Sequence, residues 1–242
     1  MATMNELKAL CDLGAGSEIG AWVNAHASIA EAWQQSIRAD LMMWILGRTA
    51  DGKHSDSRVA LSSCALDCAT MDLVQVPAGD IRERIAHAVE LHRAYLADPC
   101  DSTLRRAFDA AEQALSYAQS AARRAGDIAQ EAKASLDRSN SAAAAADLDD
   151  TDDGIITDAD ADRAQDQWDV AVAAATEAGV ALAVAAAAAA AVDVAHAVNA
   201  ICAHAELSVP THAREDCAAI VRRHYPEPPT IAAMQAATKG ES

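Results

Sequence analysis

Alanine governs what this chain of 242 residues can fold into. Hydrophobic residues make up 52% of the sequence, yet aromatic residues make up only 3%, and alanine supplies most of the difference. Alanine is the strongest helix former but fills little core volume. Ten glycines and six prolines leave few turn signals for a β-protein. We therefore expect an all-α fold in which close contact between helices matters more than large side chains.

Residues 1–98 have the pattern of several short amphipathic helices. Ser28 and Glu31 have the spacing of a capping box, and the apolar residues that follow at helical spacing predict one helix to about Gly47. A second helix is predicted over about residues 57–72. A third is predicted from an N-cap at Asp80 to about residue 98, because a residue before proline disfavours the helical conformation.

Residues 99–242 are richer in alanine and predict two long antiparallel helices. The first is expected over about residues 101–138 and the second from about 158–161 to 207, with an acidic loop over 140–160 between them. A last short helix is predicted over about 211–225, and three prolines from Pro226 onward predict an extended tail. We expect the two regions to form one continuous domain.

The acidic segment has two interpretations that the sequence leaves open. Residues 147–169 contain ten aspartates and one arginine, a local net charge of −9. Such a run is typical of a solvated linker. Residues 149–160 also align with a calcium-binding EF-hand loop, with Gly154 at its turn. The ligands would be Asp149, Thr151, Asp153, the Ile155 carbonyl, Thr157 and Asp160. Thr151 and Asp160 depart from the usual ligands, so any calcium binding is expected to be weak, and no other cofactor is predicted.

Charge and motifs exclude several classes of function. The formal net charge of −17 argues against direct binding of a nucleic-acid backbone. The sequence has no G-x-S-x-G motif, no P-loop and no G-x-G-x-x-G motif, so no enzyme is predicted. The longest uncharged run, between Glu177 and Asp193, is shorter than the ~20 apolar residues of a membrane helix. The first residues have no signal-peptide pattern, so a cytoplasmic protein with free thiols and no membrane partner is expected.

Arginines near two of the predicted helices form the remaining cluster of interest. Arg82, Arg84 and Arg93 lie on or near one helix, and Arg38 and Arg48 flank the helix with the tryptophans. One interpretation pairs these arginines with the carboxylates of Glu83, Glu90, Asp40 and Asp67. The other makes them a patch for an anion or a partner, because arginine binds carboxylate and phosphate with two parallel hydrogen bonds.

The order of these segments resembles a known family. Trp33 precedes the segment R-A-D-L-M-M-W-I-L-G-R at 38–48, V-P-A-G-D-I-R follows at 76–82, and an Ala-rich part closes with I-V-R-R at 220–223. This pattern resembles the Imm-5-like group of immunity proteins of bacteria and phages. The matching positions are Asp40, Trp44, Arg48, Pro77, Asp80 and Arg82. Asp80 stands where we would expect a glutamate, and the acidic loop is not a feature of the family.

The resemblance implies a small intracellular protein that binds and neutralises a toxin, with no established active site. We therefore expect a non-enzymatic immunity protein that covers the working surface of a protein toxin or defence effector. The alternative is a phage counter-defence protein that mimics nucleic acid or captures a nucleotide signal as its ligand. The candidate binding residues are Arg38, Asp40, Trp44, Arg48, Asp80, Arg82 and Arg84. Broad alanine faces are also compatible with a homo-oligomer.

Overall fold

The computed structural model of the protein describes residues 2–52, 54–71, 73–146, 158–192 and 212–240. These residues contain helices and no strand, so the all-α prediction is confirmed. In chain order the elements are α1 (Met4–Asp12), α2 (Ser17–Asn24), α3 (Ile29–Gln35), α4 (Ala39–Thr49), α5 (Asp56–Thr70), η1 (Leu73–Gln75), α6 (Asp80–Ala97), α7 (Asp101–Ala146), α8 (Asp158–Val192), α10 (His212–His224) and α11 (Ile231–Gly240).

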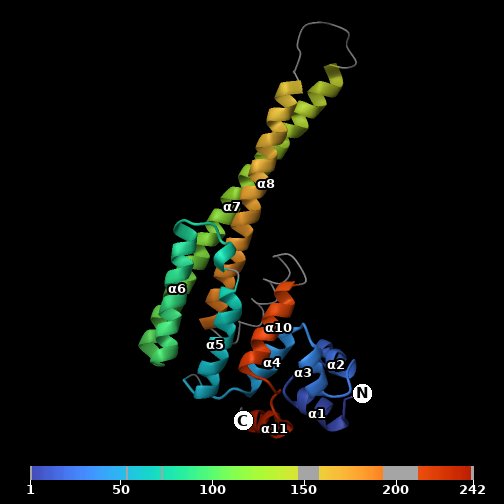
Figure 1. Cartoon of the computed structure of the whole chain (residues 1–242), viewed down its shortest axis with the longest axis vertical. Helices are drawn as coiled ribbons and strands as arrows, with labels where there is room; N and C mark the ends of the chain where they lie inside the picture. Colours follow the sequence, from blue (N-terminus) through green and yellow to red (C-terminus); the bar gives the residue numbers. More distant parts are fainter. Residues whose placement is uncertain (1, 53, 72, 147–157, 193–211, 241–242) are drawn as a thin grey trace.

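Two long helices organise the molecule. α7 and α8 lie side by side and antiparallel, and one half of this hairpin packs against α5 and α6 (Figure 1). The other elements, α1–α6 with α10 and α11, form what we call the body. Within the body, α10 lies against α4 and α5, and α11 lies against α1 and α4. The C-terminal helices are therefore packed among the N-terminal ones.

The core consists of two clusters of buried side chains, and α4 contributes to both. Met42, Met43 and Leu46 of α4 belong to the larger cluster, which also takes in α5, α6 and the alanines of the hairpin. Leu41 and Ile45, on another side of α4, belong to the smaller cluster with residues of α1, α2 and α11. A helix that is apolar on nearly every side must be surrounded by protein, and α4 therefore fixes the position of the N-terminal motif.

The prediction of one helix from residue 28 to 47 is wrong. The chain leaves the helical conformation at Ser36, which divides the segment into α3 and α4. Arg222 of α10 donates hydrogen bonds to the carbonyl oxygens of Trp33 (3.3 Å) and Ser36 (2.7 Å), and the Trp22 indole donates to Ser36 Oγ (3.1 Å). The bonds from Arg222 satisfy backbone carbonyl groups that the end of α3 exposes, and the bond from Trp22 holds the Ser36 side chain. Because these partners lie far away in the sequence, the local apolar spacing could not reveal the break.

The start of α6 also differs from the prediction. Gly79 is the N-cap residue, and Asp80 is the first residue of the helix. Gly79 has φ 144° and ψ −174°, a backbone conformation that is essentially restricted to glycine. The sharp turn before α6 therefore depends on this glycine. Asp80 instead places its carboxylate in the first turn of the helix, where a negative charge is favourable.

The long helices confirm the predicted pair but shift its boundaries. α7 continues through the alanines to Ala146, so residues 140–146 of the predicted acidic loop are helical. The high helix propensity of consecutive alanines explains this extension. Residues 147–157 lie outside the described part of the chain. So do residues 193–211, which include the predicted final turns of the second long helix.

The predicted extended tail is wrong beyond residue 230. Residues 231–240 form α11, which begins next to Thr230, whose hydroxyl accepts a hydrogen bond from the Ala233 amide (3.2 Å). Met234 of this helix is fully buried in the smaller cluster with Leu10 and Val23. One methionine in a short polar and alanine-rich helix gives little periodicity, so the packing could not be read from the sequence.

Among the described residues, one stretch is long and apolar enough to cross a membrane by length and composition. It is Asp160–Ala189 in α8, with a mean hydropathy of 1.9 in its most apolar window, and 33% of that window is buried inside the protein. Buried core helices of soluble proteins pass the same test.

Candidate functional site

The first two predicted binding residues hold α2 to α4. The Arg38 guanidinium donates to both carboxylate oxygens of Asp40 (2.7 and 2.9 Å) and to Glu18 on α2 (2.6 Å). Its hydrogen bonds to Asp40, followed by those to Glu18, keep the pKa of Arg38 above its ordinary value. Of the two interpretations of the arginines, this geometry fits pairing with carboxylates at Arg38. These side chains brace the helices of the body.

Trp44 and Arg48 form a second pair, one helical turn apart on α4. The Arg48 guanidinium lies 5.6 Å from the centre of the Trp44 ring, which is a cation–π contact. Trp44 is half-buried against the smaller core cluster, and Arg48 is exposed. The pair therefore covers part of that cluster with a charged surface.

Two of the three remaining predicted residues, Asp80 and Arg84, contact Tyr117 of α7 at the start of α6. The Tyr117 hydroxyl donates to Asp80 over 3.4 Å, and the Arg84 guanidinium lies 4.5 Å from the centre of the Tyr117 ring. Arg82 turns back and donates to the Val76 carbonyl over 3.4 Å. Asp80 therefore connects the start of α6 to the hairpin, and Arg82 connects α6 to the turn that precedes it.

The structure does not bring the seven predicted binding residues together. Four of them belong to α4 and the residue before it, among the body helices, whereas the other three lie at the start of α6 against the hairpin (Figure 1). Asp67, one of the proposed carboxylate partners, bonds with His224 of α10 instead (2.8 Å). The seven predicted binding residues therefore make two separate sets of structural contacts, one around α4 and one at the start of α6.

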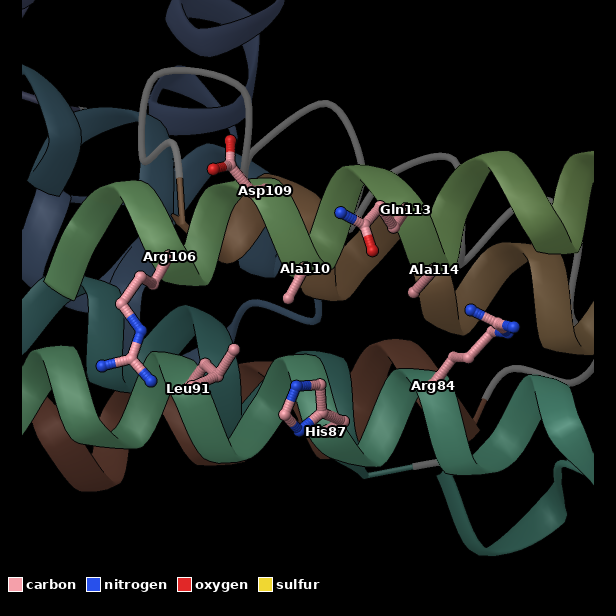
Figure 2. Close-up of a pocket in the computed structure, with 8 residues that line it drawn as sticks. All are labelled: Arg84, His87, Leu91, Arg106, Asp109, Ala110, Gln113 and Ala114. Atoms are coloured by element: carbon pink, nitrogen blue, oxygen red, sulfur yellow. The ribbon is translucent and has the colours of Figure 1, made fainter. Parts of the chain in front are cut away.

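A cavity between α6 and α7 gathers basic side chains that the sequence did not group. It has a volume of about 310 Å³. α6 contributes Arg84, His87 and Leu91, which are three and four residues apart and so share one helix face. α7 contributes Arg106, and its Ala110 and Ala114 form the floor of the cavity. Figure 2 shows Arg84 and Arg106 reaching from opposite helices at the two ends of the cavity, with His87 between them.

Only Arg84 of this cavity was among the predicted binding residues. The spacing of Arg84, His87 and Leu91 on one helix face was a usable signal in the sequence. Arg106 could not be found in this way, because it lies on another helix and only the packing of α6 on α7 brings it close. A neighbouring cavity of about 360 Å³, beside the turn at residues 76–81, is lined in part by Asp80 and Tyr117.

The outer part of the hairpin carries a third hollow. The cavity beside the 76–81 turn extends to Arg124 on α7 and Ala174 on α8, which also line it. Beyond them, the described residues of α7 (125–146) and α8 (158–173) lie against each other alone, and we call this pair the outer arm (Figure 1). A groove of about 640 Å³ runs between its helices. Ile128 and Val170 line this groove and are 60% and 71% exposed.

The predicted calcium ligands lie mostly outside the described residues. Asp149, Thr151, Asp153, Ile155 and Thr157 belong to the undescribed segment. Asp160 lies in the first turns of α8 and accepts a hydrogen bond from Arg163 (2.6 Å). Within the described part of the chain, no three His, Cys, Asp or Glu side chains are grouped closely enough to hold a metal ion.

Two further titratable groups have shifted pKa values. Burial lowers the pKa of His92, which is packed between α5 and α6, to about 4, and its Nε2 shares a hydrogen bond of 2.7 Å with Ser62 Oγ. His92 is therefore a buried core residue, and its Nδ1 atom has no hydrogen-bond partner among the described residues. Hydrogen bonds with Ser102 and Thr103 lower the pKa of the Cys100 thiol to about 7. Neither group lies in one of the three hollows.

A scan of the sequence against protein-family models finds no matching family, and searches of the curated proteins and of the solved structures find no match either. The functional proposals therefore depend on the contacts, cavities and charges of this chain itself.

Proposed function

We propose that this protein is a non-enzymatic immunity protein of the cytoplasm that binds a basic toxin or defence effector and covers its working surface. The observation that carries the proposal is the outer arm, which extends beyond the body (Figure 1). The groove between its two helices is lined by exposed apolar side chains. Exposed apolar grooves edged by polar residues are typical of protein-binding surfaces. Ile128 and Val170 would be the apolar anchors of the contact.

The charge of the arm supports a positively charged partner. Residues 158–173 of α8 contain five aspartates and one arginine, a net charge of −4. Residues 125–146 of α7 contain three acidic and two basic side chains, a net charge of −1. The outer arm therefore has a net charge of −5, although Arg138 and Arg163 line its groove. A surface of one sign accelerates the encounter with a partner of the opposite sign, and salt weakens this effect. A counter-defence protein that mimics nucleic acid would use the same aspartates but would have no need of the apolar groove. The groove therefore favours a protein-binding function over simple mimicry.

The Imm-5-like resemblance belongs to the same proposal. Its matched residues Asp40 and Arg82 contact neighbouring segments inside this protein, and Trp44 covers the smaller core cluster. We infer that these positions maintain the fold of the family, while the outer arm determines which partner is bound. A family of immunity proteins could change its partner by changing the arm and keeping the motif.

Protection of cells from a toxic gene product tests the proposal. The products of the genes next to this one would be expressed singly, alone and together with the wild-type chain. We expect the wild-type chain to restore growth against one of them. Val170→Arg, which places a cation in the groove, should abolish the protection. Complex formation between the two purified proteins should also weaken as the salt concentration rises.

Val172→Arg is the matched control. Val172 is also exposed on α8 (37%) but does not line the groove. Val172→Arg changes the net charge by the same amount as Val170→Arg. It should leave protection intact, and circular dichroism should show that both variants remain helical. The proposal is overturned if no neighbouring product is neutralised, or if Val170→Arg protects as well as Val172→Arg.

A further inference from the structure

The cavity between α6 and α7 is independent of the outer arm and has the properties of a small-molecule site. On each helix the lining residues span about two helical turns, or about 10 Å along the axis, and the two arginines lie at opposite ends of this span (Figure 2). Between these ends, Leu91 from α6 and Ala110 and Ala114 from α7 provide an apolar floor, and His87 and Gln113 lie beside it (Figure 2). The small alanine side chains leave the space that a larger residue would fill. Its volume of about 310 Å³ lies at the lower end of the range for ligand pockets.

The charges around this cavity are unusual for so acidic a protein. Three basic side chains, Arg84, His87 and Arg106, converge on it in a chain with a net charge of −17. Among the described residues, no carboxylate forms an ion pair with any of the three. Asp109 is the acidic residue of the lining, and Figure 2 shows its carboxylate pointing away from α6. The cavity therefore presents positive charge that no carboxylate of the described residues neutralises in an ion pair.

The position of Arg84 is set before any ligand arrives. Its guanidinium lies 4.5 Å from the centre of the Tyr117 ring, and this contact orients the group without removing its charge. An arginine that is already oriented loses less side-chain entropy when it binds an anion. Guanidinium groups are suited to phosphate in particular, because their parallel N–H groups match two of its oxygens.

We propose that this cavity binds an elongated small molecule with a phosphate group at each end and an apolar middle, such as a short alkyl chain that carries a phosphate at both ends. Arg84 binds one phosphate and Arg106 binds the other, while His87 offers a ring nitrogen between them. The middle of the ligand lies on the floor of Ala110 and Ala114. None of these residues lines the groove of the outer arm, so this inference does not depend on the proposed toxin partner.

Calorimetric titration of the full chain with three probes tests the proposal. The probes are hexane-1,6-diol bisphosphate, which carries a phosphate at each end of an apolar chain, hexyl monophosphate and inorganic phosphate. The bisphosphate should bind most tightly, because it alone can reach both arginines across the apolar floor. Arg84→Gln and Arg106→Gln should each weaken its binding about tenfold or more, the usual effect of losing a charged hydrogen-bond partner.

Arg105→Gln serves as the control. Arg105 is an exposed neighbour of Arg106 on α7 but does not line the cavity. Arg105→Gln therefore has the same net charge as Arg106→Gln but keeps all the residues of the site. Its affinity should equal that of the wild-type chain. The proposal is overturned if none of the probes binds, if inorganic phosphate binds as tightly as the bisphosphate, or if Arg105→Gln weakens binding as much as Arg106→Gln. Unfolding curves of all three variants check that each remains folded.

Discussion

The body and the hairpin solve the problem of helix packing in opposite ways. The body buries large side chains, among them Trp33, Met42 and Leu61, each at most 1% exposed. The hairpin packs through small ones, and Ala107, Ala111, Ala114 and Ala118 form a buried stripe along α7 at a spacing of three or four residues. On α8 the facing side chains include Ala181, Ala185 and Ala188.

The two parts therefore depend on different features of side-chain packing between helices. In the body, the shapes of large side chains determine how short helices fit, and each large side chain contributes much of the buried area. In the hairpin, small side chains allow the helices to approach closely over a long length, and many small contacts add up. The body should therefore be sensitive to lost volume, and the hairpin to added volume.

The largest expected effect comes from removing volume in the body. Trp33 is fully buried, and its indole N–H donates to the Tyr225 carbonyl (2.9 Å), which joins α3 to the end of α10. Trp33→Ala should lower the free energy of unfolding by about 3–5 kcal/mol. Urea denaturation at pH 7.5 measures this change. Ile37→Ala is the control, because Ile37 is 43% exposed, and the change should be within about 0.5 kcal/mol.

The next effect concerns α6, which lies between α5 of the body and α7 of the hairpin. Burial lowers the pKa of His92 from 6.5 to about 4 in the folded protein. Between these two values the unfolded chain binds more protons than the folded one, so stability falls as the pH falls through this window and levels off below about pH 4. The total loss should approach about 3 kcal/mol.

His92→Gln isolates this contribution, because glutamine does not titrate and can still bond with Ser62. Urea denaturation of both proteins at pH 7.5, 6.0, 5.0 and 4.5 measures it. The difference in unfolding free energy between wild type and variant should shift in favour of the variant as the pH falls. A difference that stays constant over this range would contradict the assigned cause.

Adding volume to the hairpin should have a smaller effect than removing it from the body. Ala118 is fully buried in the stripe of α7, so the longer side chain of Ala118→Leu has no space. We expect a loss of stability of about 1–3 kcal/mol from the overpacked contact. Ala134→Leu, at an exposed position of the same helix, should be nearly neutral. Equal effects of the two substitutions in thermal unfolding would mean that the hairpin does not depend on close approach.

Sequence reasoning recovered the parts of the fold that depend on local pattern. The helix class, α5 and the long antiparallel pair follow from helix propensity and apolar spacing. What it missed depends on distant partners. The break at Ser36 is satisfied by Arg222 of α10, and α11 is held by the burial of Met234 among the N-terminal helices. No local pattern contains this information.

The candidate site was harder to predict than the fold. The seven predicted binding residues were joined by their order in the sequence, and the structure separates them into contacts of α4 and contacts of α6. Of these seven residues, only Arg84 lines the α6–α7 cavity. Arg106 from α7 lies at the other end of the same cavity. Residues on one helix face can be grouped from their spacing. Residues on two helices cannot, because the offset between α6 and α7 is set by the turn at Asp98–Cys100 and by packing.

The smallest expected effect is a gain in stability from a substitution that adds volume to the hairpin. Gly126 lies in the middle of α7, and a Cβ atom added there would meet no other atom within 4 Å. The glycine therefore contributes no close contact, while its backbone freedom favours the unfolded chain. Gly126→Ala should raise the free energy of unfolding by about 0.5–1 kcal/mol. The added volume is harmless here because it lies outside the alanine stripe.

Gly79→Ala provides the opposite case in thermal unfolding. The Cβ atom would again meet nothing within 4 Å, but Gly79 has φ 144°, which other residues rarely adopt, so the substitution should destabilise by about 1–3 kcal/mol. Since neither site is crowded, a different sign at the two positions would separate backbone conformation from packing. If Gly126→Ala also destabilised the protein, a group closer than α8 would have to pack against position 126, which contradicts the open space around it.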